Sequence, residues 1–310
     1  MSEQEVSQRI KRPKLKKPRI KVPKKRRRLK YIAILPSIVT LMNGLCGLTA
    51  IIFASKGLDM AWKPQLLPKV NISFFALAGY MIFLGMIADM LDGHVARISK
   101  STSSFGAQLD SLCDVISFGA APAFLMLKLV EAHTSRLQLE NFRHILFFER
   151  IVYFIAIIYA MCAIIRLARF NVENTEDDAA HLSFAGLPSP AAAGMIVSAV
   201  IFQQDFLPKI MESPDSFLRA FELITIWVLP VISLMAGVLM VTRIPYPHLM
   251  NRLLRGKKSF PTFLLVVFAI LLAIWNIQLA MTLGFFTFML YGIIRWIITR
   301  LIPKKPQLSS

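Results

Sequence analysis

Long uncharged runs of apolar residues constrain the fold of this chain more than any other feature of its sequence. Residues 259–294 carry no formal charge, and neither do residues 70–88. A helix needs about 20 apolar residues to cross the hydrocarbon core of a membrane. Hydrophobic residues make up 55% of the 310 positions and charged residues only 17%, which excludes a soluble globular domain. The sequence therefore predicts an all-α, polytopic transmembrane helix bundle.

Eight segments are expected to cross the membrane. The last two belong to one uncharged run of 36 residues. As a single helix that run would be about 54 Å long, nearly twice the hydrocarbon thickness, so we expect a turn near Asn276–Gln278. Six of these spans lie within residues 31–245, and residues 246–310 would add two transmembrane helices and a short cytoplasmic tail. The expected spans are residues 31–55, 70–92, 107–128, 149–169, 186–204, 221–242, 259–276 and 279–299.

Residues 1–30 form a basic arm that holds 14 of the 36 Lys and Arg residues, in a chain with a net charge of +18. Pro13, Pro18 and Pro23 rule out a continuous helix, so we expect the arm to be disordered. A nucleic-acid-binding arm would have a similar composition. Because this arm directly precedes an expected span, we interpret it as a cytoplasmic segment that contacts anionic lipid headgroups, with no nucleic-acid partner.

The distribution of Lys and Arg also predicts the orientation of the chain. Segment 243–258 adds five basic residues on the same side of the membrane as the arm. Since basic loops stay in the cytoplasm, both termini are expected there, in agreement with an even number of spans. The three cysteines, Cys46, Cys113 and Cys162, all lie in expected spans and indicate no disulfide framework.

Four aspartates lie at one end of the second and third expected spans, between uncharged runs: Asp89, Asp92, Asp110 and Asp114. Carboxylates inside a membrane are costly and therefore mark functional sites. Four of them at close range cannot all stay ionised without a counter-charge, and carboxylate oxygens suit Mg²⁺, Mn²⁺ or Ca²⁺. The sequence therefore predicts a divalent-metal site.

The spacing of the aspartates supports this interpretation. Asp89 and Asp92 are three residues apart and Asp110 and Asp114 four apart, so each pair shares one helix face. If residues 98–105 connect two antiparallel helices, both pairs lie at the same membrane depth. The alternative is that the aspartates cap helices or pair with nearby basic residues, which would account for one or two of them.

A cation transporter is the alternative from another functional class, because intramembrane carboxylates can also bind ions there. Two features argue against it: the aspartates lie at helix ends and not at the midplane, and the sequence has no inverted repeat.

The aspartates belong to a longer pattern, Asp89-x2-Asp92-Gly93-x2-Ala96-Arg97-x8-Gly106-x3-Asp110-x3-Asp114. This pattern resembles the signature of the CDP-alcohol phosphotransferase family, with every fixed position filled. The resemblance implies a membrane enzyme that transfers a phosphatidyl group from CDP-diacylglycerol to an alcohol and releases CMP. It also implies a six-helix catalytic core and a homodimer. The resemblance covers residues 31–245 and leaves the arm and the C-terminal helix pair outside.

Within this family pattern, two Mg²⁺ or Mn²⁺ ions are expected among the four aspartates, where they would bind the diphosphate. The resemblance makes Asp114 the base that deprotonates the acceptor hydroxyl, and a metal ligand alone is the alternative. CDP-diacylglycerol would contact Asp92 and the residues that follow it. Arg97 could engage the diphosphate bidentately, unless it is only an interfacial arginine whose charge reaches water. The further contacts expected are Gly93, Ala96 and Ser103, the last of which could instead cap a helix.

Thr40 and Asn43 form a polar stripe with Gly47 on the first expected span. Such a stripe often serves only helix packing. The spacing is also similar to the Pro-x3-Thr-x2-Asn pattern at the start of the family's core, which implies that Asn43, with Thr40, reaches the nucleotide.

A second polar string, Arg166-Leu-Ala-Arg169-Phe-Asn171, follows the fourth apolar run. The two arginines could be simple cytoplasmic anchors. With Gly186-Leu-Pro-Ser-Pro190 downstream, however, the string is similar to the serine-accepting, membrane-embedded branch of the family in bacteria and archaea. That likeness implies L-serine as acceptor, whose carboxylate the arginines would bind, in an inner-membrane protein. The orientation predicted from the basic residues places the active site at the cytoplasmic face. Inositol phosphate, glycerol phosphate and choline remain as alternative acceptors.

Overall fold

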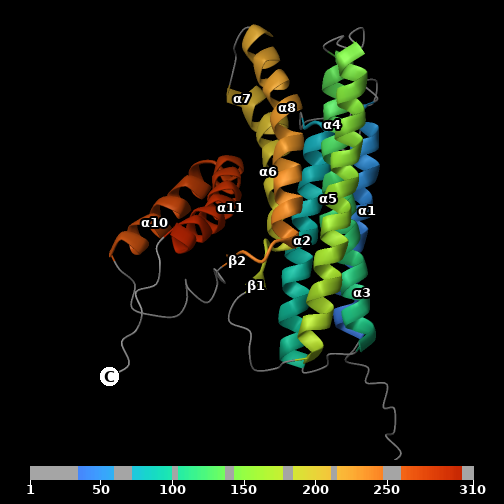
Figure 1. The fold of residues 1–310 in the computed structure, drawn as a ribbon, viewed down its shortest axis with the longest axis vertical. Coiled ribbons are helices and arrows are strands. Elements are labelled where there is room, and N and C mark those ends of the chain that lie inside the picture. Colours follow the sequence, from blue (N-terminus) through green and yellow to red (C-terminus); the bar gives the residue numbers. More distant parts are fainter. Residues whose placement is uncertain are drawn as a thin grey trace, which may run out of the picture. The chain divides into compact units, whose positions relative to one another are not determined.

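The structure is a computed structural model and describes residues 34–58, 72–99, 104–136, 143–176, 184–210, 215–246 and 260–301. The basic arm, the C-terminal tail and Ser103 therefore lie outside the described residues. Within these ranges nearly all of the chain is helical, which confirms the predicted all-α bundle (Figure 1). The helices are α1 (Ile34–Lys56), α2 (Phe74–Ser99), α3 (Ser104–Asp114), the π-helix η2 (Val115–Ala120), α4 (Ala121–Arg136), α5 (Arg143–Glu176), α6 (Ser189–Ile201), the π-helix η4 (Phe202–Phe206), α7 (Leu207–Ile210), α8 (Asp215–Val241), α10 (Phe260–Trp275) and α11 (Ile277–Leu301).

Six helical segments among the described residues are long and apolar enough to cross a membrane, which makes this an integral membrane protein. The other two expected spans, residues 186–204 and 259–276, are helical in most of their described parts but are not among the six. The first belongs to a helical segment that runs from Ser189 through α6, η4 and α7 to Ile210 and contains the polar residues Gln203, Gln204 and Asp205, and α10 has 16 residues. Of the eight expected spans, six are thus among the helices long and apolar enough to cross a membrane and two are not. The six are Ser37–Lys56, Phe74–His94, Phe105–Ser135, Leu146–Val172, Leu223–Val241 and Ile277–Ile298.

Local side chains explain where two of these helices, α2 and α11, begin. The Ser73 hydroxyl accepts a hydrogen bond from the Ala76 amide at 3.1 Å and so caps the start of α2. The expected break in the last apolar run occurs at Asn276, between α10 and α11. The Asn276 side-chain oxygen accepts from the Leu279 amide at 3.0 Å, which caps α11. The predicted turn near Asn276–Gln278 is therefore confirmed.

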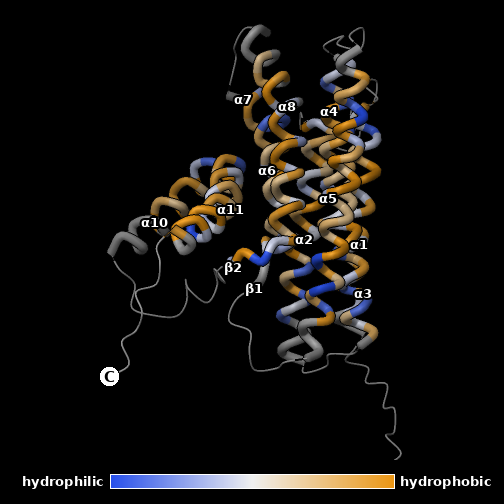
Figure 2. The backbone as a smooth tube through the Cα atoms, in the orientation of Figure 1, coloured by the Kyte–Doolittle hydropathy of each residue, from blue (hydrophilic) through white to orange (hydrophobic). Residues whose placement is uncertain are grey.

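Helix α6 lies in the interior of the bundle and contacts α2, α5, α8 and α11. Most of its residues are buried, including Ala192, Ala193 and Met195, so it has no solvent-facing or lipid-facing stripe. Helix α1, in contrast, exposes large apolar side chains such as Ile38, Leu45 and Ile52. Such a surface suits contact with lipid. Figure 2 shows hydrophilic stretches near the α3 end of a bundle whose tube is otherwise mostly hydrophobic.

A two-stranded antiparallel sheet joins the segments that precede α6 and follow α8. Strand β1 (Phe184–Ala185) pairs with β2 (Pro245–Tyr246). Gly186 then turns the chain with φ +93°, and a Cβ there would lie 2.8 Å from the Thr242 carbonyl oxygen, so only glycine fits. Its amide donates to the Ile244 carbonyl at 2.9 Å. The entry to α6 is thereby fixed to the end of α8.

Candidate active site

Three of the predicted metal ligands come together at the α3 end of the bundle. Asp89 on α2 and Asp110 and Asp114 on α3 each offer one carboxylate oxygen, and these three oxygens lie within 4.8 Å of one another. Such a group of oxygens has the chemistry and the size to hold a divalent cation.

The fourth aspartate, Asp92, lies beside this cluster but has a different contact. Its carboxylate accepts a hydrogen bond from the Thr40 hydroxyl on α1, and both side chains are buried. Asp92 is close enough to Asp89 and Asp110 for their charges to interact. The structure thus assembles a group of three carboxylates with Asp92 next to it, and does not place all four equivalently.

Asn43, also on α1, holds Asp114. Its side-chain amide donates to Asp114 Oδ1 at 2.9 Å, and Asn43 is fully buried. Its own oxygen, Oδ1, is buried without a hydrogen-bond partner. A buried acceptor without a donor, on a side chain that also contacts Asp114, fits a site that is completed by a cation or a ligand. Both residues of the polar stripe on α1 therefore contact the aspartates.

Close packing brings α1 to this position. A Cβ on Gly47 would lie 2.8 Å from the Ser117 Cα, so only a glycine lets the two backbones approach this closely. Ser117 donates to the Asn43 carbonyl at 2.8 Å and is itself buried within η2. This π-helix starts directly after Asp114, and such π-segments occur often at functional sites.

Arg166 on α5 faces the aspartate cluster from another side. Its guanidinium donates to the Ser189 hydroxyl at 2.7 Å, at the start of α6, and Ser189 is fully buried. The Arg166 charge interacts with those of Asp114 and Asp89. Arg166 is thereby tied to the first residue of α6, and its charge is near enough to Asp114 and Asp89 to interact with theirs.

The other two residues predicted from this segment, Arg169 and Asn171, form hydrogen bonds to α8 and to α3. Asn171 is tied to α3, because its amide donates to the Ser111 hydroxyl at 2.8 Å. Ser111 is the residue directly after Asp110, so Asn171 supports the helix that carries the cluster. Arg169 donates to the Val241 carbonyl at 3.4 Å, a long contact at the end of α8.

The residues expected to contact CDP-diacylglycerol after Asp92 are described only in part. Gly93 is half-buried on α2, one residue beyond Asp92. Ala96 and Arg97 continue the same helix, but their side chains lie outside the described part of the structure, as does Ser103 as a whole. Their contacts with a nucleotide therefore remain predictions.

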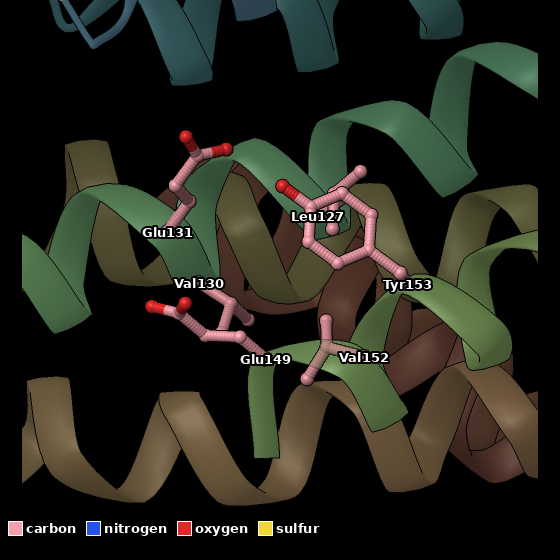
Figure 3. Close-up of a pocket in the computed structure, with 6 residues that line it drawn as sticks. All are labelled: Leu127, Val130, Glu131, Glu149, Val152 and Tyr153. Carbon is pink, nitrogen blue, oxygen red and sulfur yellow. The ribbon is translucent and has the colours of Figure 1, made fainter. Parts of the chain in front are cut away.

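A hollow elsewhere in the bundle contains none of these residues. It lies between α4 and α5, and Figure 3 shows its lining of Leu127, Val130, Glu131, Glu149, Val152 and Tyr153. Glu131 forms an ion pair with Lys128 at 2.8 Å. We assign no function to this hollow.

Sequence reasoning assigned no role to three serines that hold the site together: Ser111, Ser117 and Ser189. Ser117 and Ser189 belong to polar strings within apolar runs, which is a weak signal for buried hydrogen bonds. Their partners are more than 20 residues away in the chain, so periodicity could not reveal them.

Comparison with known proteins identifies the family of this chain. The family model for CDP-alcohol phosphatidyltransferases matches residues 33–299. The chain belongs to this family. The match includes α10 and α11, which the motif resemblance had left outside. An enzyme of this family binds a nucleotide-activated alcohol, which excludes the transporter alternative, and the family generally uses divalent metals.

Several relatives share one name. A CDP-diacylglycerol–serine O-phosphatidyltransferase of Helicobacter pylori is 31% identical over 223 residues, which are 72% of this chain and 81% of the relative. The protein of that name from Methanocaldococcus jannaschii is 28% identical over 225 residues, 73% of this chain and 79% of the relative. The one from Saccharomyces cerevisiae is 30% identical over 164 residues, which cover 51% and 50% of the two chains.

Proposed function

We propose that this protein transfers the phosphatidyl group of CDP-diacylglycerol to the hydroxyl of L-serine, giving phosphatidylserine and CMP. The relatives from a bacterium, an archaeon and a yeast are named for this reaction. The observation that carries the proposal is the hydrogen bond that holds the Arg166 guanidinium on Ser189 at 2.7 Å, where its charge interacts with those of Asp114 and Asp89. Serine carries a carboxylate that choline lacks, and a guanidinium can bind a carboxylate with two parallel hydrogen bonds.

The aspartates are proposed to hold two Mg²⁺ or Mn²⁺ ions. Asp89, Asp110 and Asp114 would be the main ligands, with Asp92 beside them. When bound, the ions would neutralise the diphosphate oxygens and stabilise the departing CMP. The chain's own contribution is orientation, because Thr40 holds the Asp92 carboxylate and Asn43 holds that of Asp114.

Asp114 is proposed as the general base. Asn43 donates to its Oδ1, so Oδ2 is the oxygen that would take the proton of the serine hydroxyl. The hydroxyl oxygen then forms a bond to the β-phosphorus, which carries the diacylglycerol. The bond from that phosphorus to the oxygen bridging it to CMP breaks in line, and CMP leaves with the electron pair.

The surroundings of the site complete the proposal. Gly93, Ala96, Arg97 and Ser103 would line the path of the CDP group. The acyl chains need no cavity, since they can extend between helices into the bilayer. The site and both termini would face the cytoplasm, the basic arm would contact anionic headgroups, and the enzyme would be a homodimer.

The test is an acceptor panel with purified protein. The enzyme in mixed micelles receives CDP-diacylglycerol and, in parallel, L-serine, inositol phosphate, glycerol phosphate or choline, and the lipid product is identified by mass. We expect phosphatidylserine from serine and no product from the other alcohols. Arg166→Lys should raise the KM for serine by about 10-fold, since an ammonium cannot replace the bidentate contact. Product from another alcohol alone would overturn the assignment of serine.

A further inference from the structure

Helix α11 packs along α6 in the opposite direction, and polar contacts fix its register. At the end of α6 farther from Ser189, the Gln278 side chain donates to the carboxylate of Asp205 on η4 and to the Tyr80 hydroxyl on α2, the latter at 2.7 Å. Seven residues earlier on α6, the Thr282 hydroxyl donates to the Ser198 carbonyl at 3.1 Å. These part-buried polar contacts leave α11 little freedom to slide along α6.

Two aromatic rings, Phe285 and Tyr246, add contacts between α11 and the elements nearer the active site. The Phe285 ring fills the notch that Gly194 leaves on α6, so that a Cβ on Gly194 would overlap the ring. The same ring stacks on Phe83 of α2 at 5.9 Å between centroids. Farther along α11, Gly292 leaves a notch for the Tyr246 ring of β2, which also packs on Phe288 at 5.5 Å.

The contacts of Phe285 and of Tyr246 both support the segment that begins α6 at Ser189. Phe285 supports α6 directly, and α6 begins with Ser189. Tyr246 pairs with Phe184 in the small sheet, and β1 lies only four residues before Ser189 in the chain. Ser189 is the residue that accepts the hydrogen bond of Arg166 at 2.7 Å.

We infer that α11 is a positioning element for the acceptor side of the active site, acting through α6 and the β1–β2 sheet on Ser189 and Arg166. The inference rests on the proposed role of Arg166 in binding the acceptor. It gives the C-terminal helix a function in catalysis without any contact to substrate. A displacement of about 1 Å in a group that orients a substrate is enough to change turnover strongly.

The experiment compares two variants that disturb α11 at different places. Phe285→Ala empties the Gly194 notch, and Gly292→Val displaces the Tyr246 ring. With whichever alcohol the acceptor panel identifies as substrate, we expect each to raise the KM for the alcohol by about 3- to 10-fold, while the KM for CDP-diacylglycerol changes less than about twofold. Phe285→Leu, which keeps bulk in the notch, should restore the wild-type KM. Leu283→Ala, on the exposed face of α11, is the matched control and should leave both constants unchanged.

A double variant tests the route through Arg166. If α11 acts on that residue, Phe285→Ala added to Arg166→Lys should raise the KM for the alcohol little beyond Arg166→Lys alone. A lower kcat with unchanged KM would mean that α11 only contributes to the folded fraction, and fully additive effects would mean that it acts elsewhere. Either result would overturn the inference. Because the assays use the identified alcohol, failure of serine as acceptor would be seen separately in the panel.

Discussion

Asp114 is proposed to have two roles, as a ligand of the cation and as the general base. It belongs to the group of carboxylates that can hold a cation, and it is the proposed base. Asn43 contacts only one of its oxygens in the described structure, which leaves a second oxygen for the proton. The two roles can be separated experimentally, because an amide keeps the size of the side chain and loses its basicity.

Replacing Asp114 by Asn is therefore expected to lower the rate of transfer by at least about 10²- to 10⁴-fold while CDP-diacylglycerol still binds. CMP release measures the first quantity, and nucleotide-dependent thermal stabilisation in detergent measures the second. Glu131→Gln, a carboxylate on α4 that pairs with Lys128, serves as control and should retain activity. Near-normal turnover by the Asp114 variant would remove the base assignment.

Asn43 acts through Asp114 and is a positioning residue in the proposed mechanism. Asn43→Ala should lower kcat by about 10- to 100-fold, the range found when groups that orient metal ligands are removed. Since the same change should weaken cation binding, the Mg²⁺ concentration for half-maximal activity should rise as well. Thr49→Ala on the same helix removes only a hydrogen bond to the Leu45 carbonyl and should change neither value. An unchanged Mg²⁺ dependence in Asn43→Ala would contradict the role given to Asn43.

At the scale of elements, the site depends on how closely α1 approaches η2. The aspartates are on α2 and α3, but the groups that hold Asp92 and Asp114 are on α1. Gly44 and Gly47 make this approach possible, since a Cβ on Gly44 would lie 2.9 Å from the Cys113 sulfur and one on Gly47 still closer to Ser117. A glycine in a helix here is a packing requirement and not a flexible point.

Gly47→Ala should destabilise the protein by about 1–3 kcal/mol, because the added methyl group meets backbone atoms that cannot move aside independently. Gly284→Ala on α11 is the matched control, since no atom lies within 4 Å of its added Cβ. That control should be neutral or stabilising by up to about 1 kcal/mol, as expected for alanine in a helix. Thermal unfolding of both variants in one detergent makes the comparison, and equal stabilities would contradict the close packing at Gly47.

At the scale of the whole molecule, the stability of the enzyme is expected to depend on whether a cation compensates the aspartate charges within the membrane helices. The aspartate cluster lies at the ends of transmembrane helices that are otherwise apolar, where uncompensated carboxylates are unfavourable. A resident cation would relieve the repulsion among Asp89, Asp110 and Asp114. Removing that cation should therefore affect stability as well as catalysis.

We expect chelator-treated protein to be inactive and to recover on addition of Mg²⁺ or Mn²⁺. Independently of activity, saturating Mg²⁺ should raise the unfolding temperature of the wild type, because binding to the folded state stabilises it by about 2.7 kcal/mol at 100 times the dissociation constant. Asp110→Asn should reduce that shift. Full activity after complete removal of divalent ions would contradict the proposed metal site.

The sequence by itself determined the class of fold and predicted which carboxylates form the candidate site. Apolar runs predicted the helices, the length of the last run predicted the break at Asn276, and the spacing of the aspartates predicted that they would meet. These are properties of single helices, because the period of a helix fixes which residues share a face.

Only the tertiary structure decided which faces meet. The contact of Thr40 with Asp92, the hydrogen bond of Arg166 to Ser189 and the packing of α11 on α6 join residues far apart in the chain. In a membrane, helices pack through small notches and a few hydrogen bonds and not through a hydrophobic stripe, since lipid is as apolar as the helix surface. The sequence of one helix therefore carries little information about its partner, and the π-helix η4, which directly follows α6, has no sequence signal that we recognised.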